Sequence, residues 1–119
     1  MPTQPTPNVT SADVARIVSR DFPAGRADEV LAMVNEYGTE RWHGEPHRVR
    51  LAVLKLAAGN IERLRREIEE AKRDYRDVLA PAEYPSYCRR VPGPGVVPPE
   101  EEQRIIDADW KQYQDWLTR

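Results

Sequence analysis

The sequence predicts an all-α protein, built as a compact bundle of about four helices plus an amphipathic C-terminal helix on a Pro-rich connector. The 11 prolines of the 119 residues gather at the N-terminus and in 92–99, which leaves three long proline-free gaps, 24–45, 47–80 and 100–119. Because proline costs roughly 3 kcal/mol inside a helix, long helices are confined to these gaps. Within the gaps, apolar residues recur every three or four positions, and glycines or capping residues separate the segments.

The length of the chain predicts one domain. The positions of the prolines and of the apolar repeats divide that domain into four parts. We expect a flexible N-terminal segment over 1–10, a helical body over 11–85, a Pro/Gly-rich connector over 86–99 and the C-terminal helix over 100–119.

The body is expected to begin with two helices. Thr10 or Ser11 can cap the first, which Phe22-Pro23 ends, since the residue before a proline is pushed out of the helical region. The second helix is predicted from about Arg26 to Tyr37, with Gly38 as its C-terminal stop.

Two further helices follow in the body. Pro46 suits the first turn of a third helix, which runs to about Ala58 and is apolar on more than half its circumference, as in a buried helix. In Gly59-Asn60, the glycine is predicted to end the third helix and the asparagine to cap the start of the fourth. The fourth helix is predicted from Ile61 to about Leu79, with one narrow apolar stripe and acid-first ion pairs on an outer, solvated face.

The stretch Ser86–Pro99 (SYCRRVPGPGVVPP) has no helical or strand period and predicts a semi-rigid extended connector. Glutamates 100–102 then suit the first turn of the last helix. An isolated helix of this length is marginal in water, so its apolar face is expected to dock on its own body, on a second copy or on another protein. The residues predicted to make that contact are Ile106, Trp110, Tyr113, Trp116 and Leu117.

Composition excludes several classes of protein. The net charge of -2 provides no overall field for nucleic acid, and the mean hydropathy of -0.75 with no long apolar run argues against a membrane span. The segment Met1–Thr10 lacks the basic start and apolar stretch of a signal peptide. With the single cysteine, Cys88, these features favour a cytoplasmic protein.

No catalytic site, metal site or cofactor is predicted. His43 and His47 have a metal-ligand spacing on paper, but Gly44 and Pro46 lie between them, so one continuous helix is not expected to hold both. We expect a polar loop there in which Trp42 packs. Cys88 lacks a neighbouring base, and no nucleophile lies in a recognisable pattern. The sequence therefore favours a protein that is not an enzyme.

These patterns predict a protein-interaction or self-assembly module that uses the C-terminal helix. Its predicted partner is either a second copy of the chain, in a homodimer formed by arm exchange, or another protein. The alternative is nucleic-acid binding through the basic surface of the third and fourth helices. Residues 41–80 carry 10 basic and 7 acidic side chains, a net +3. The candidate nucleic-acid contacts are Arg65, Lys72 and Arg76.

The segment Gly25–Pro85, with GRADEVLAMVNEYG, LAVLKLAAGNIERLRR, AKRDYRDVLA and EYP, resembles a group of small bacterial proteins of no established activity. This resemblance implies a bacterial, cytosolic, all-α protein. More weakly, the helix order around Gly59-Asn60-Ile61 is similar to the ubiquitin-associated type of three-helix module. In this chain Glu36–Thr39 and a longer insertion replace the binding loop of that module, so ubiquitin binding is not implied.

Overall fold

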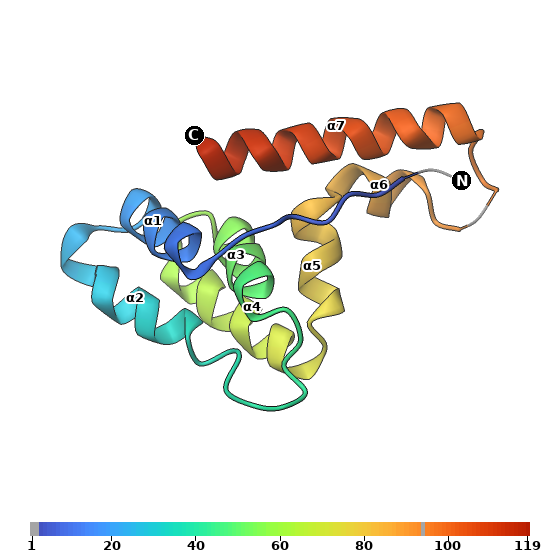
Figure 1. Cartoon of the computed structure of the whole chain (residues 1–119). Coiled ribbons are helices and arrows are strands. Elements are labelled where there is room, and N and C mark those ends of the chain that lie inside the picture. The colour runs from blue at the N-terminus through green and yellow to red at the C-terminus, as the bar shows by residue number, and fades with distance from the viewer. Residues whose placement is uncertain (1–2, 94) are drawn as a thin grey trace.

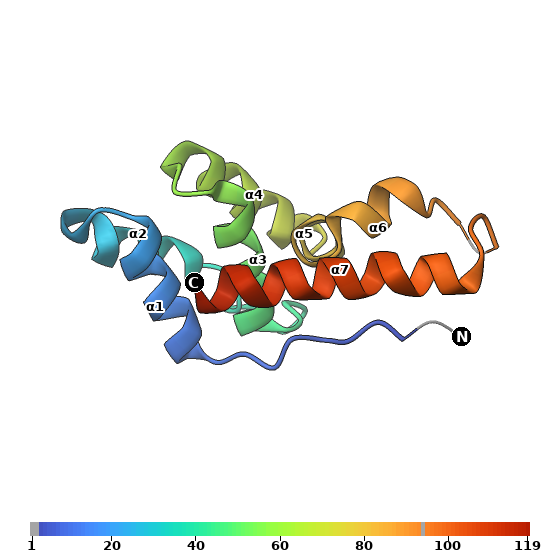
Figure 2. The same ribbon diagram turned by 90° about the horizontal axis from the view of Figure 1, so that it is seen from above.

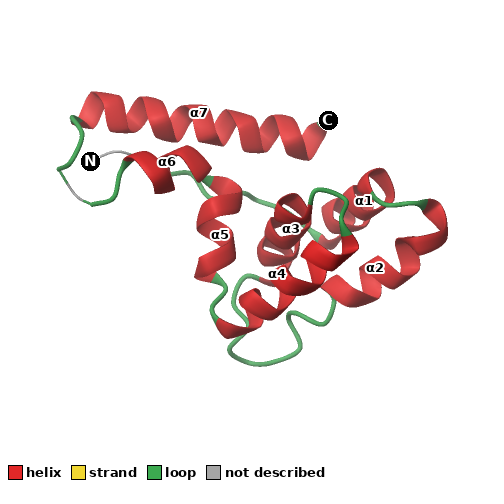
Figure 3. Cartoon of the chain, turned by 180° about the vertical axis from the view of Figure 1, so that it is seen from behind, coloured by secondary structure: helices red, strands yellow, loops and turns green. Residues whose placement is uncertain are grey.

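The computed structural model describes residues 3–93 and 95–119, and over these residues helices are the only regular elements (Figures 1 and 3). The predicted all-α class is confirmed. The elements are α1 (Ser11–Asp21), the 3-10 turn η1 (Ala24–Arg26), α2 (Ala27–Val34), α3 (Pro46–Ala57), α4 (Ile61–Arg73), α5 (Arg76–Glu83), α6 (Pro85–Arg90) and α7 (Pro99–Thr118).

Helix α3 forms the centre of the body and packs against α1, α2, α4 and α5. It begins with Pro46 at its first position, where the missing N–H costs nothing. As its broad apolar surface predicts, it is largely buried, through Val49, Leu51, Ala52, Val53, Leu54 and Ala57.

The first two helices differ slightly from expectation. Helix α1 has the predicted start, where the Asp13 carboxylate accepts a hydrogen bond from the Thr10 backbone N–H at 2.9 Å, and this bond is the main cause of the lowered pKa of Asp13. The second predicted helix is shorter, because α2 ends at Val34. Tyr37 instead lies in the following turn, fully buried, and supports the loop that leads to α3.

A single fourth helix over Ile61–Leu79 was a wrong prediction, since α4 ends at Arg73 and α5 begins at Arg76. Asp74 adopts an extended backbone with φ -155°, and its carboxylate accepts a hydrogen bond from the Arg76 backbone N–H at 3.1 Å. A short acidic side chain that accepts from the backbone N–H two residues later forms a local turn, which competes with continuation of the helix. Helix α5 also continues through Pro81, which lacks one N–H donor but ends the helix only two residues later.

The first part of the predicted extended connector is also helical. Pro85 starts α6, and the carboxylate of Asp109, on α7, accepts hydrogen bonds from the backbone N–H groups of Ser86 at 3.2 Å and Tyr87 at 2.8 Å. Asp109 is only 2% exposed. Because this cap comes from a distant helix, no local pattern indicates it. The connector is therefore reduced to residues 91–98, of which Pro94 lies outside the described residues. The described part contains bends and a turn, with Gly95 at φ +75°, so it is not a continuous extended segment.

The N-terminal segment lies extended alongside α7 in both views (Figures 1 and 2). Of the predicted flexible region 1–10, Met1 and Pro2 lie outside the described residues. The remainder makes side-chain contacts: Pro7 is buried and Val9 packs against the core. The segment thus covers part of the body before α1 begins.

Replacement of Gly59 by alanine is expected to lower the free energy of unfolding by about 1–2 kcal/mol. Gly59 has φ +81°, and an added Cβ would lie 3.0 Å from the backbone oxygen of Asp21. Gly25→Ala is the matched control, because a Cβ there meets nothing within 4 Å. Urea unfolding followed by circular dichroism measures both variants, and equal stability of the two would contradict the prediction.

Candidate interaction surfaces

The apolar face of α7 is used within the single chain. Helix α7 packs against α5 and α6, and Ile106, Tyr113 and Leu117 are buried, with exposed fractions of 2%, 0% and 7%. Trp110 and Trp116 are half-buried. Of the five residues predicted for interaction, Tyr113 and Leu117 belong to the main core and Trp116 packs against it, whereas Ile106 and Trp110 lie outside that cluster.

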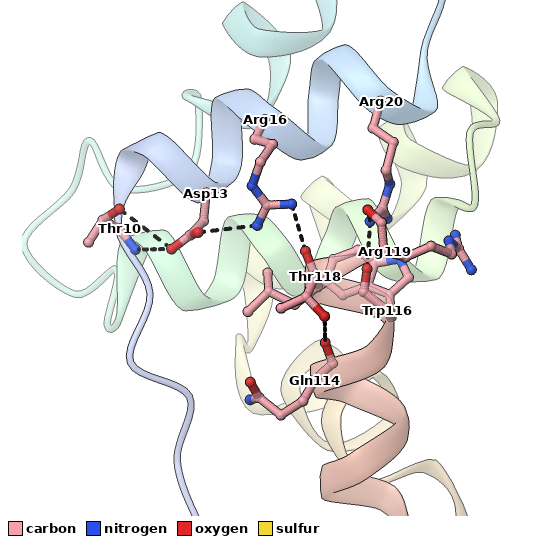
Figure 4. Close-up of polar contacts among 9 residues, drawn as sticks. Thr10, Asp13, Arg16, Arg20, Gln114, Trp116, Thr118 and Arg119 are labelled. Atoms are coloured by element: carbon pink, nitrogen blue, oxygen red, sulfur yellow. Dashed lines mark hydrogen bonds and ion pairs between the residues drawn. The ribbon is translucent and has the colours of Figure 1, made fainter.

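Two arginines of α1 hold the C-terminal end of α7 (Figure 4). Arg16 donates a hydrogen bond to the carbonyl oxygen of Leu117 at 2.7 Å, and Arg20 donates to that of Trp116 at 2.5 Å. The guanidinium of Arg20 also lies 5.3 Å from the centre of the Trp116 ring. The last carbonyls of a helix lack partners within it and carry partial negative charge, so two cations stabilise this end. Neither contact follows from the sequence pattern.

A buried ion pair joins α3 to α5 near α7. Arg48 donates hydrogen bonds to both carboxylate oxygens of Glu83, at 2.7 and 2.6 Å, and Glu83 is only 2% exposed. These hydrogen bonds raise the pKa of Arg48. The hydroxyl of the neighbouring Tyr113 is buried and has no hydrogen-bond partner in the described part of the chain, and this burial raises the pKa of Tyr113.

The loop between α2 and α3 is held by His43 and Tyr37. The Nδ1 atom of His43 accepts hydrogen bonds from the backbone N–H groups of Gly38 at 2.9 Å and Glu40 at 3.3 Å, and its ring stacks on Tyr37 with 4.5 Å between ring centres. The Tyr37 hydroxyl donates to the carbonyl oxygen of Gly44 at 2.7 Å, and burial raises the pKa of Tyr37 to about 12. His43 therefore has a local structural role.

The same loop exposes Trp42, whose exposed fraction is 69%. The expectation that Trp42 packs was wrong. Tyr37 is the aromatic side chain of this region that is fully buried, and the indole of Trp42 lies outside, edge-on to His43 with 5.9 Å between ring centres. Two hollows adjoin the indole. One, of about 250 Å³, is lined by residues 71–76, and the other, of about 440 Å³, by Glu36, Thr39, Glu40 and Lys72. A tryptophan within a polar loop was the only sequence signal for this surface.

The three candidate nucleic-acid contacts are not one free basic patch. Lys72 forms ion pairs with Glu36 and Glu69, both at 3.0 Å, and these hydrogen bonds raise its pKa. Arg76 pairs with Asp74 at 3.0 Å. Arg65 is exposed on α4. Carboxylates thus neutralise two of the three cations.

The other candidate groups lie apart. Cys88 is exposed on α6, and His47 lies in the first turn of α3 with a buried Nδ1 that has no partner among the described side chains. Within residues 3–93 and 95–119, no three His, Cys, Asp or Glu side chains are close enough together to hold a metal ion. Over the same residues, no helix combines the length and apolar character needed to cross a membrane.

A cavity of about 510 Å³ lies between the end of α7 and the turn that joins α3 to α4. Its lining carries both signs of charge, including Asp21, Lys55 and Asp115. Asp21 is held by Arg20 and Asp115 by Lys111, at 2.8 and 2.6 Å, and burial lowers the pKa of Lys55.

No family model, curated protein or solved structure matches the chain. The resemblances inferred from the sequence therefore stay predictions.

Proposed function

We propose that the chain is a non-enzymatic protein-interaction module whose contact surface is centred on Trp42. The observation that carries the proposal is an exposed indole, 69% accessible, on a loop held by hydrogen bonds and ring stacking. Tryptophan is among the residues that most often dominate the binding energy of interfaces. A loop that is already ordered loses less entropy on binding.

The surroundings of Trp42 support the same function. The two hollows beside the indole are lined largely by charged and polar side chains, and exposed polar residues such as Thr39, Glu40 and Arg41 surround it. This arrangement, an aromatic centre with a polar rim, is typical of protein–protein interfaces.

Trp42→Ala is expected to leave stability within about 0.5 kcal/mol while weakening partner binding at least tenfold, because the indole is exposed and contributes little to the core. Val96→Ala is the matched control, since Val96 is the other large apolar side chain exposed in the described chain, at 56%. Pull-downs with all three proteins test the proposal. A partner lost only with Trp42→Ala supports it, and partners that bind all three proteins equally would contradict it.

A second candidate function is self-association by exchange of α7. It is favoured by the nature of the α7 contacts, because a second copy has the same Arg16, Arg20 and core residues to bind the end of α7 and to bury Tyr113. Light scattering of the unaltered chain tests it. A mass of twice 13.7 kDa that falls with Trp110→Ala/Tyr113→Ala supports exchange, and a 13.7 kDa particle at every concentration would contradict it.

A further inference from the structure

The N-terminal segment is held at its backbone by a side chain of α7. The backbone N–H of Thr3 donates to Oε1 of Gln103 at 2.6 Å, and Nε2 of Gln103 donates to the carbonyl oxygen of Thr3 at 3.0 Å. Nε2 also donates to the carboxylate of Asp107 at 2.8 Å. Because a carboxylate only accepts, Asp107 determines which way the amide of Gln103 faces. Gln103 is therefore oriented to pair with one residue of an extended chain.

Two further contacts fit a proline-containing chain. The Tyr84 hydroxyl, on a ring that is 2% exposed, donates to the carbonyl oxygen of Pro5 at 2.5 Å, and Pro7 is buried. An extended proline-rich chain has no internal hydrogen bonds, so its carbonyls are free to accept from such donors. Its proline rings supply apolar area at little entropic cost, since φ is already restricted.

Trp110 lies two turns after Gln103 in α7, so the helical period places both residues on the same side of the helix. The N-terminal segment runs alongside α7 (Figure 2). Trp110 is half-buried without belonging to the main core. Aromatic side chains beside hydrogen-bond donors are the usual means by which proteins bind extended proline-rich peptides.

We propose that the surface formed by Tyr84, Gln103 and Trp110 is a docking site for an extended proline-containing peptide of a partner protein, and that residues 3–9 occupy this site in cis. The bound segment then acts as an intramolecular competitor. Because the segment leads directly into α1 of the same chain, its binding is intramolecular, and an incoming peptide must displace it before it binds. This surface is separate from the Trp42 loop, and the proposal does not depend on the function proposed above.

The test uses the full chain and a fluorescent, end-capped peptide of residues 3–10, TQPTPNVT. The variant Pro5→Gly/Pro7→Gly weakens the cis segment by removing both rings and adding backbone freedom. Fluorescence anisotropy is expected to show that the peptide binds this variant at least tenfold more tightly than it binds the unaltered chain. A peptide with both prolines replaced by glycine is expected not to bind.

Matched substitutions in the same variant identify the site. Adding Gln103→Ala or Tyr84→Phe is expected to weaken peptide binding at least fivefold. Gln114→Ala, also on α7, is expected to leave binding unchanged, because the Gln114 side chain makes no hydrogen bond within residues 3–93 and 95–119. If circular dichroism shows that the double variant does not fold, the single variant Pro5→Gly, which keeps the buried Pro7 ring, is used in its place.

Three results would overturn the proposal. The first is absence of binding to a folded proline variant, and the second is binding that is indifferent to Gln103 and Tyr84. The third is a dimer of the unaltered chain that the peptide dissociates, because the site would then belong to the N-terminal segment of a second copy.

Discussion

Arg48→Met is expected to lower the free energy of unfolding by about 3–5 kcal/mol, because it leaves the carboxylate of Glu83 buried without a partner. Glu83 is 2% exposed and receives both of its short hydrogen bonds from the guanidinium of Arg48. Methionine retains most of the length and apolar stem of arginine, so the loss reports mainly the uncompensated charge. Urea unfolding followed by circular dichroism measures the effect.

The double variant Arg48→Met/Glu83→Gln separates charge from packing. Removal of the buried charge is expected to restore at least half of the lost stability, since a neutral amide is less costly to bury than an unpaired carboxylate. Arg73→Met is the control, because Arg73 pairs with Glu70 on the surface with its own side chain 75% exposed, and its loss is expected to cost less than about 1 kcal/mol. If Arg48→Met and Arg73→Met lowered the free energy of unfolding equally, the loss in Arg48→Met could not be assigned to a buried, unpaired carboxylate.

Two substitutions of Tyr113 are expected to differ in their effect on the free energy of unfolding. Tyr113→Ala removes a fully buried aromatic ring from the contact between α7 and the body, and a loss of about 3–5 kcal/mol is expected. Tyr113→Phe keeps the ring and removes a buried hydroxyl that has no partner among the described residues, so stability is expected to stay equal or to rise by about 1 kcal/mol.

Lys111→Ala, on the exposed side of α7, is the control for helix propensity and is expected to change stability by less than about 0.5 kcal/mol. A loss of more than about 1 kcal/mol in Tyr113→Phe would show that the hydroxyl makes a stabilising hydrogen bond, contrary to this account. Thermal and urea unfolding of the three variants show whether the Tyr113 hydroxyl is unpaired or makes a stabilising hydrogen bond.

Much of the fold could be predicted because its signals are local. The cap at Thr10, the proline at the start of α3 and the asparagine cap of α4 each act within one turn of the backbone that they stabilise. All three helices begin where these signals predict. The apolar stripe of α7 similarly predicts which of its sides is buried, since the helical period alone determines which residues share a side.

Three features depend on residues far apart in the sequence. Asp109 caps α6, which the sequence pattern alone assigns to an extended connector, and Arg16 and Arg20 of α1 cap the distant end of α7. The exposure of Trp42 depends on how Tyr37 and His43 stack beneath the loop. In each case the deciding contact forms only after the helices have packed.

The sequence by itself determined the all-α class, the start of most helices and the amphipathic nature of α7, because backbone restrictions and side-chain periodicity act over a few residues. Only the tertiary structure decided that α7 covers its own body, that residues 3–9 lie along it and that Trp42 remains exposed. Those outcomes depend on burial and on hydrogen bonds between residues 100 or more positions apart, as between Thr3 and Gln103 or between Arg16 and Leu117, and local patterns do not record them.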